Sequence, residues 1–173
     1  MRHWTIDLDH SHVGFAVRHL AIATVRGRFR LFAGHIETDD AGTPLRLEAT
    51  ADAASIDTGV ERRDAHLRSG DFLDAGAHPV LALASAHIVA GDAGAARVDA
   101  TLTMRGVTHP VSLALRWHGP LAGTAGEPRL VGEATATIRR SQWGLTWNRA
   151  IEAGGMAVSD EVSLHFEVQA VPA

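Results

Sequence analysis

Apolar and polar residues alternate with a period of two along much of the chain of 173 residues. The clearest runs cover residues 111–118 and 162–169. Because successive side chains of a β-strand point to opposite faces, this alternation predicts strands with one apolar face. Similar or noisier runs occupy residues 4–8, 25–31, 45–49, 80–89, 98–104 and 130–138. About eight strands of this kind are typical of a closed barrel or a sandwich.

One segment departs from the strand pattern and predicts a short helix over residues 61–69. Thr58 precedes Glu61 by three positions, which is the spacing of a capping box. Gly70 stands where such a helix would end. Residues 13–20 fit either a second short helix or a strand, and the periodicity leaves both alternatives open.

The composition limits the classes of protein that the chain can represent. Hydrophobic residues make up 46% of the chain, which suits one compact domain over residues 1–173. Cysteine is absent, which excludes disulfides, thiolate metal sites and cysteine nucleophiles. The formal net charge of −4 argues against nucleic acid as the main partner. The first residues carry acids and histidines where a signal peptide needs an apolar run, so we expect a cytoplasmic protein.

The interior of the predicted barrel is the main candidate for a functional site. An eight-stranded barrel is just wide enough either to be filled by side chains or to hold one small ligand. Several presumed inward positions are small, which leaves volume for an apolar guest unless large neighbours fill it. The pattern alone leaves these two interpretations open. The small residues are Gly27, Ala49, Ala100, Gly132, Ala134 and Ala136.

A family resemblance extends in order over nearly the whole chain. The segments that carry it are IDLDHSHVGFAVRHL (6–20), VRGRFRLFAGHI (25–36), SIDTGVERRDAHLRSGDFLDAGAHP (55–79), LTMRGVTHPVSL (102–113), WGLTWN (143–148) and VSDEVSL (158–164). The most specific elements are SIDTG, RDAHLRS and LTMRGVTHPV, in which several uncommon residues coincide at fixed spacing. With these motifs the chain resembles the YceI-like family of polyisoprenoid-binding, lipocalin-like proteins.

The resemblance implies an all-β fold, an extended eight-stranded antiparallel lipocalin-like barrel with one or two short helices, often as a homodimer. It also implies an interior that holds a long isoprenoid chain, such as that of a quinone or a prenyl phosphate. Burial of each methylene contributes about 0.8 kcal/mol, so a long chain can bind tightly without specific polar contacts. We therefore expect a bacterial carrier or store for an isoprenoid or other long-chain amphiphilic lipid, with transient membrane contact and without catalysis or a cofactor. Well-known relatives are periplasmic.

The residues expected to line the cavity are mostly aromatic or aliphatic. Trp143 and Trp147 flank Leu145 at the spacing that places all three side chains on one face of a strand. Each of them would fit an ordinary aromatic core equally well. The full candidate set is Phe15, Val17, Leu20, Phe29, Phe32, Phe72, Met104, Leu115, Trp117, Ala134, Ala136, Trp143, Leu145 and Trp147.

Charged residues in the predicted helix and strands favour structural roles. We interpret the polar residues at positions 64–71, His66 among them, as a hydrogen-bonded bracket that holds the helix over the barrel. Alternate arginines at residues 26–30 and the pair at residues 139–140 could meet the phosphate of a prenyl phosphate or an anionic membrane. A solvated face is the simpler interpretation of both.

Two other classes of function remain as alternatives. A small hydrolase or isomerase acting on a lipid-like substrate would need a serine, a histidine and a carboxylate in contact at the cavity mouth, and no G-x-S-x-G motif occurs. A histidine-assisted metal or stress-response binding protein would need three convergent ligands, whereas His10 and His12 supply two, with Asp7 and Asp9 nearby. We predict no catalytic residue and no metal site.

Overall fold

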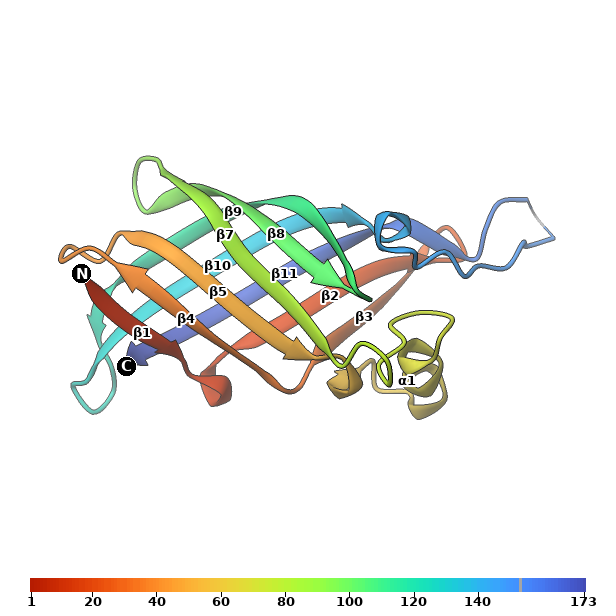
Figure 1. Ribbon diagram of the computed structural model, residues 1–173, viewed down its shortest axis with the longest axis horizontal. Helices are drawn as coiled ribbons and strands as arrows, with labels where there is room; N and C mark the ends of the chain where they lie inside the picture. The colour runs from red at the N-terminus through yellow and green to blue at the C-terminus, as the bar shows by residue number, and fades with distance from the viewer. Residues whose placement is uncertain (153) are drawn as a thin grey trace.

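The computed structural model describes residues 1–152 and 154–173, which form an antiparallel β-barrel (Figure 1). Its sheet contains 11 strands in the order β1-β4-β5-β7-β8-β9-β10-β11-β2-β3-β6, and β1 pairs in addition with β11. This additional pairing closes a ring of eight strands, which confirms the predicted fold. Closure satisfies the backbone hydrogen bonds of strands that would otherwise be edges.

The strands and helices have the following bounds. The strands are β1 (Arg2–Ile6), β2 (His12–His19), β3 (Ala23–Phe29), β4 (Phe32–Thr38), β5 (Pro44–Asp52), β6 (Ile56–Asp57), β7 (Val80–Ala90), β8 (Ala95–Met104), β9 (Val107–Ala122), β10 (Pro128–Arg139) and β11 (Val158–Pro172). The helical elements are the 3-10 helices η1 (Leu8–His10), η2 (Ala53–Ser55) and η3 (Arg140–Trp143), and the α-helix α1 (Glu61–Arg68).

Three positions in the barrel wall are each built from two short strands. β1 and β2 both pair with β11, β1 with residues 170–172 and β2 with residues 158–167. In the next position of the wall, β4 pairs with β1 and β3 pairs with β2. In the position after that, β5 pairs with β4 and β6 pairs with β3. The segments η1 and η2 interrupt two of these positions, so the wall can bend where the ladder is broken. Eleven strands thus make an eight-stranded barrel.

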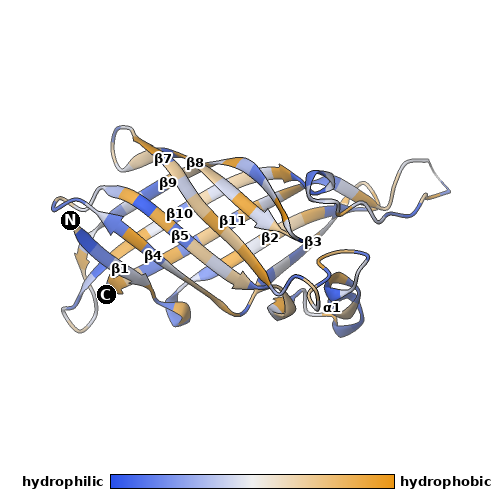
Figure 2. Cartoon of the chain, viewed as in Figure 1, coloured by the Kyte–Doolittle hydropathy of each residue, from blue (hydrophilic) through white to orange (hydrophobic). Residues whose placement is uncertain are grey.

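The strand register brings apolar side chains together on the inner face. Ala134 lies opposite Leu115 on β9 and opposite Phe166 on β11. Directly paired residues in an antiparallel sheet share a face, so the alternation seen in the sequence gathers the apolar side chains on one side of the sheet. Figure 2 shows the hydrophobic and hydrophilic residues alternating along the strands. Gly27 has a different role, because a Cβ there would come within 2.3 Å of the Phe15 ring that packs over it.

The segment at residues 12–19 is a strand, β2, which settles the alternative that the sequence left open. The helix prediction is confirmed by α1, but the predicted capping box is wrong. Thr58 donates both its backbone N–H and its hydroxyl to the buried carboxylate of Asp64 instead of capping Glu61. Arg63 in turn donates to the hydroxyl and the carbonyl oxygen of Thr58. A buried acceptor one turn into the helix competes successfully with the local box.

The strand predicted over residues 143–147 is also wrong. Residues 140–143 form η3, which ends at Gly144 in the left-handed region with φ +76°. The guanidinium of Arg140 is buried and donates to the carbonyl oxygens of Leu145 at 2.7 Å and Trp147 at 3.0 Å. Because Arg140 occupies these carbonyl groups, the segment is held as a compact loop and does not pair in the sheet.

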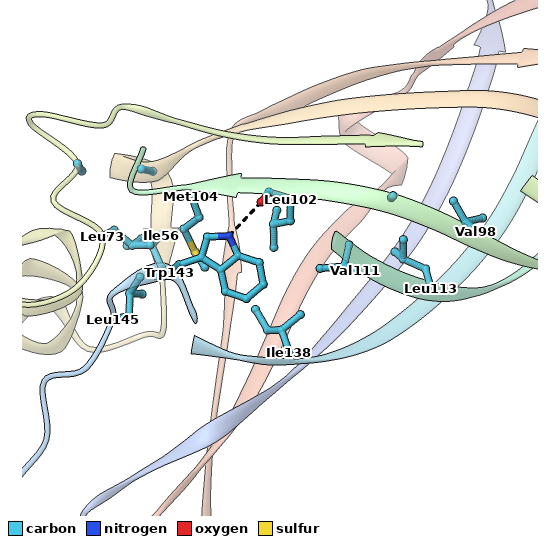
Figure 3. Packing of buried hydrophobic residues seen from close by; sticks show 13 residues of the cluster. Ile56, Leu73, Val98, Leu102, Met104, Val111, Leu113, Ile138, Trp143 and Leu145 are labelled. Atoms are coloured by element: carbon cyan, nitrogen blue, oxygen red, sulfur yellow. Dashed lines mark hydrogen bonds between the residues drawn. The ribbon is translucent and has the colours of Figure 1, made fainter. Parts of the chain in front are cut away.

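The main hydrophobic core lies along β8, β9 and β10 around Trp143 (Figure 3). Trp143 is completely buried, and its indole N–H donates to the carbonyl oxygen of Leu102 at 2.9 Å. A smaller cluster of Trp4, Leu130 and Ala170 lies toward the end of the barrel where both termini lie (Figure 1). The indole N–H of Trp4 donates to the buried Thr38 hydroxyl at 3.0 Å.

A polar cluster attaches the β1–β2 junction to the neighbouring strands. One carboxylate oxygen of Asp7 lies 2.8 Å from Nη1 of Arg129 and 2.8 Å from Nδ1 of His10. Arg129 also donates to Glu127 at 2.8 Å and to the side-chain oxygen of Gln169 at 3.1 Å. The hydrogen bond from Arg129 holds the pKa of Asp7 below its ordinary value of 3.8. The ionised carboxylate therefore stabilises the folded state.

We expect the Asp7→Asn variant to be less stable than the wild type near neutral pH. The folded-state pKa of Asp7 is lowered, so its contribution is present above the unfolded-state pKa and is lost as the pH falls through the folded-state pKa. The difference in urea midpoint between the two proteins should therefore shrink as the pH is lowered below about 4. Asp9→Asn is the control, because Asp9 makes no ion pair with any residue that the structure describes. A difference that stays constant with pH would contradict the assignment.

Candidate ligand-binding cavity

A cavity of about 900 Å³ occupies the barrel interior. This volume lies near the upper end of the range of about 300–1,000 Å³ that is usual for small-molecule sites. Apolar side chains from strands all around the barrel line it, for example Leu47, Leu83 and Phe166. These three side chains face inward but are only half-buried, because they border empty space and are not covered by other side chains. The structure therefore favours a cavity over a filled core.

Most of the residues predicted to line a cavity do line this one. They are Phe15, Val17, Phe29, Phe32, Phe72, Met104, Leu115, Trp117, Ala134, Leu145 and Trp147. Three predicted residues do not. Leu20 is exposed in the β2–β3 turn, Trp143 is buried inside the core, and Ala136 packs against that core. Alternation identifies the inner face of a strand, but it does not say which inward positions are already covered.

The lining also contains residues that the sequence analysis missed. Those on strands lie within the alternating runs at residues 80–89, 111–118 and 162–169 but were not included in the candidate set, and they include Leu81, Leu113, Val162, Leu164 and Val168. The polar lining residues Arg62, Arg63, His66 and Arg140 had no such signal. Their positions depend on how α1 and the loop after η3 fold over one end of the barrel.

The lining residues at the two ends of the cavity differ in exposure. At the terminal end its lining includes the buried residues Pro44 and Leu130. At the opposite end its lining includes the exposed residues Val60 and Arg62 and the half-buried Val25. Figure 1 shows α1 and the β2–β3 turn at this second end, away from the termini. We call the opening beside α1 the mouth of the cavity.

An aromatic cluster lies next to the mouth. The ring of His66 meets Phe72 edge-on, with centroids 5.0 Å apart, and meets Trp147 in the same way at 4.6 Å. The guanidinium of Arg140 lies 6.0 Å from the centroid of the Phe72 ring, and burial lowers the pKa of this guanidinium below its ordinary value. His66 also pairs with Asp71 at 2.8 Å. This contact agrees with the predicted bracket around the helix.

The charges on the cavity lining are mostly positive and gather at the mouth. Arg62, Arg63 and Arg140 all line the cavity there. The acidic lining residue Glu48 lies on β5 and is ion-paired with Arg46. The apolar interior therefore leads to a cationic opening, an arrangement that suits an apolar chain with an acidic or strongly polar head.

Other candidate features have structural partners. Arg28 and Arg30 both reach Asp57, at 3.6 and 2.7 Å, and His10 pairs with Asp7. Within residues 1–152 and 154–173, no serine hydroxyl is hydrogen-bonded to an imidazole. The same residues contain no group of three or more histidine or acidic side chains placed to hold a metal ion. No helix among them is both long and apolar enough to span a bilayer.

Comparison with known proteins places the chain in a family. A UPF0312 protein from Staphylococcus aureus is 30% identical over 173 residues, which covers 98% of this chain and 96% of the relative. The crystal structure of BcnA from Burkholderia cenocepacia matches with a TM-score of 0.82 at 21% identity, covering 95% of this chain and 98% of BcnA. A polyisoprenoid-binding domain from Saccharophagus degradans matches with a TM-score of 0.74 at 20% identity, covering 100% of both chains. The model of the YceI-like domain matches residues 4–170, and the chain therefore belongs to the YceI-like family.

Proposed function

We propose that the barrel binds one long isoprenoid-type lipid in its interior and carries or stores it without catalysis. The observation that carries this proposal is the cavity of about 900 Å³ with an almost wholly apolar lining. At about 0.8 kcal/mol per methylene, burial of ten carbons would contribute about 8 kcal/mol, which corresponds to micromolar affinity before the cost of ordering the chain. The description of the structurally similar Saccharophagus degradans domain as polyisoprenoid-binding supports the same class of ligand.

Native mass spectrometry of the freshly purified protein, followed by organic extraction, tests this proposal. We expect a long-chain lipid bound at a fixed ratio to the protein, and extraction would identify it. The same spectrum reports whether the protein is a homodimer. A protein that is free of lipid, and that also takes up neither an added quinone nor an added prenyl phosphate from detergent, would overturn the proposal.

The charge at the mouth favours a ligand whose polar head lies beside α1 and whose tail extends toward the terminal end. Arg62 and Arg63 come from consecutive positions of α1, and Arg63 is held in place by its hydrogen bonds to Thr58. A prenyl phosphate would place its anionic head among these guanidinium groups, which bind phosphate oxygens well. A quinone would place an uncharged ring against the aromatic cluster of Phe72 and Trp147.

The Arg62→Gln variant distinguishes these two heads. If the ligand is a prenyl phosphate, we expect its affinity to fall about tenfold, because a hydrogen bond to a charged group contributes about 1.5–3 kcal/mol. The affinity for a quinone with the same prenyl chain should stay unchanged. Arg116→Gln is the matched control, since Arg116 is exposed on β9 and does not line the cavity. Isothermal calorimetry in detergent measures both ligands, and equal effects of the two substitutions would place the head elsewhere.

A further inference from the structure

Exposed apolar side chains gather around the mouth of the cavity. Ile22 is 87% exposed, Met156 is 60% exposed, and Leu20 and Val60 are each 48% exposed. Ile22 is the most exposed large hydrophobic residue among those that the structure describes. We call these four residues the mouth patch. Apolar groups that stay in water on a folded protein often mark a surface that meets a partner.

The mouth patch is formed by three chain segments that lie together. The backbone N–H of Leu20 donates to the carbonyl oxygen of Ala157 at 2.8 Å, which ties the β2–β3 turn to the residue after Met156. A Cβ on Gly27 would lie 2.9 Å from the Thr58 side chain, so β3 packs against the segment that leads into Val60. Figure 1 shows these segments at the end of the barrel away from the termini.

The β2–β3 turn holds its apolar residues in a conformation that costs free energy. Leu20 and Ala21 have φ values of +52° and +68°, a region that residues other than glycine seldom adopt. The backbone N–H of Ile22 donates back to the carbonyl oxygen of Leu20 at 2.9 Å, so the turn is tight. Because Ile22 is 87% exposed, the folded barrel gains almost no burial from it. A contact outside the barrel would explain why this turn carries apolar residues.

Arginines without an ion-pair partner surround the mouth patch. Within the part of the chain that the structure describes, these exposed arginines make no ion pair: Arg18, Arg26, Arg62 and Arg149. By contrast, Arg28 and Arg30 on β3 share Asp57, and Glu61 at the start of α1 is paired with Arg68. Arg149 belongs to the same region as the patch, since its carbonyl oxygen accepts from the N–H of Ala157. The exposed Glu152 lies in the same loop as Arg149 and Met156. Four unpaired arginines against this one acid leave an excess of positive charge beside the apolar patch, which complements a surface of anionic lipid heads.

We propose that the mouth patch docks on the surface of an anionic lipid bilayer, with its apolar side chains entering the head-group layer and its arginines meeting lipid phosphates. This geometry turns the mouth of the cavity toward the membrane. A lipid can then move between bilayer and barrel without crossing water. The role in lipid transfer rests on the proposed function, whereas docking itself does not.

Binding to vesicles tests the proposal directly. The wild-type protein should bind vesicles of phosphatidylglycerol and phosphatidylcholine, measured by co-sedimentation, and bind phosphatidylcholine vesicles much more weakly. Ile22→Asp should weaken binding at least about tenfold, because it removes one inserted side chain and adds an acid that anionic lipid repels. Arg62→Glu should weaken it by about fivefold or more, and raising the salt concentration should weaken the wild type. Leu121→Asp, at an exposed apolar residue near the terminal end, is the control and should bind like the wild type.

Any of the following outcomes would contradict the proposed docking surface. Failure of the wild type to bind the anionic vesicles would do so, as would equal binding by the Ile22→Asp and Leu121→Asp variants. A change from dimer to monomer in Ile22→Asp, seen by native mass spectrometry, would assign the patch to a second copy of the chain. Uptake of lipid from detergent is measured in parallel and should be unchanged in Ile22→Asp. If even the wild type takes up no lipid, the proposed function fails while the vesicle result still stands by itself.

Discussion

The Ala134→Trp variant is expected to lose its bound lipid while the protein stays folded. Ala134 lines the middle of the barrel between Leu115 and Phe166, so an indole at this position would project into the cavity. The space is empty, and the larger side chain therefore costs little of the overpacking energy seen in filled cores. If it excludes about four methylenes of the ligand, the affinity falls by about 3 kcal/mol, or roughly 100-fold.

Thr135→Trp is the matched control for this experiment. Thr135 is the next residue on β10 and points to the outer face, where its side chain is exposed. It should keep the lipid at the wild-type ratio in native mass spectrometry. Circular dichroism and a urea titration establish that both variants are folded. Retention of lipid by Ala134→Trp at the wild-type ratio would show that the ligand does not occupy this part of the barrel.

Trp143→Ala is expected to produce the largest loss of stability. Trp143 is completely buried among Leu102, Met104 and Ile138, and its truncation leaves a large cavity in the densest part of the core (Figure 3). Substitutions of this kind cost about 3–5 kcal/mol, and the hydrogen bond to the Leu102 carbonyl is lost as well. The free energy of unfolding from urea titration should fall by that amount.

Two further variants keep this expectation testable. Trp143→Phe retains most of the buried ring and should be destabilised by only about 1–2 kcal/mol, so it reports on the site even if Trp143→Ala does not fold. Trp147→Ala should cost less than Trp143→Ala, because Trp147 is half-buried and borders the cavity. A Trp143→Ala protein with the stability of the wild type would show that this indole is not part of the core.

The two tryptophans illustrate the limit of periodicity as evidence. Trp143 and Trp147 have the same local pattern, and the sequence analysis placed both on one strand face. In the structure they lie in different environments, because Arg140 binds the carbonyl groups of the segment and folds it away from the sheet. A strand needs a neighbour to pair with, and no local pattern states whether that neighbour is available.

The cationic mouth shows a second limit. Arg62 and Arg63 belong to a helix that the sequence predicts correctly, yet nothing local indicates that this helix borders the cavity. Arg140 is adjacent in sequence to the exposed Arg139 but is buried. Its burial follows from four backbone carbonyl oxygens that come from β11 and from the loop after η3. Contacts between distant segments place α1 beside the cavity and bury Arg140. The sequence does not specify these contacts pair by pair.

The sequence by itself determined most of the strands, their apolar faces and the short helix, because these depend on the order of side chains along one segment. It left β2 open, gave no signal for β4 and β6, and wrongly predicted a strand at residues 143–147. Only the tertiary structure decided between a filled and a hollow barrel. Phe15 fills the space over Gly27, whereas Ala134 faces open volume. Whether an inward position is covered or faces the cavity depends on the radius of the closed barrel and on which residues meet across it. Both are set by tertiary contacts, namely the pairing of β1 with β11 and the packing of α1 over one end.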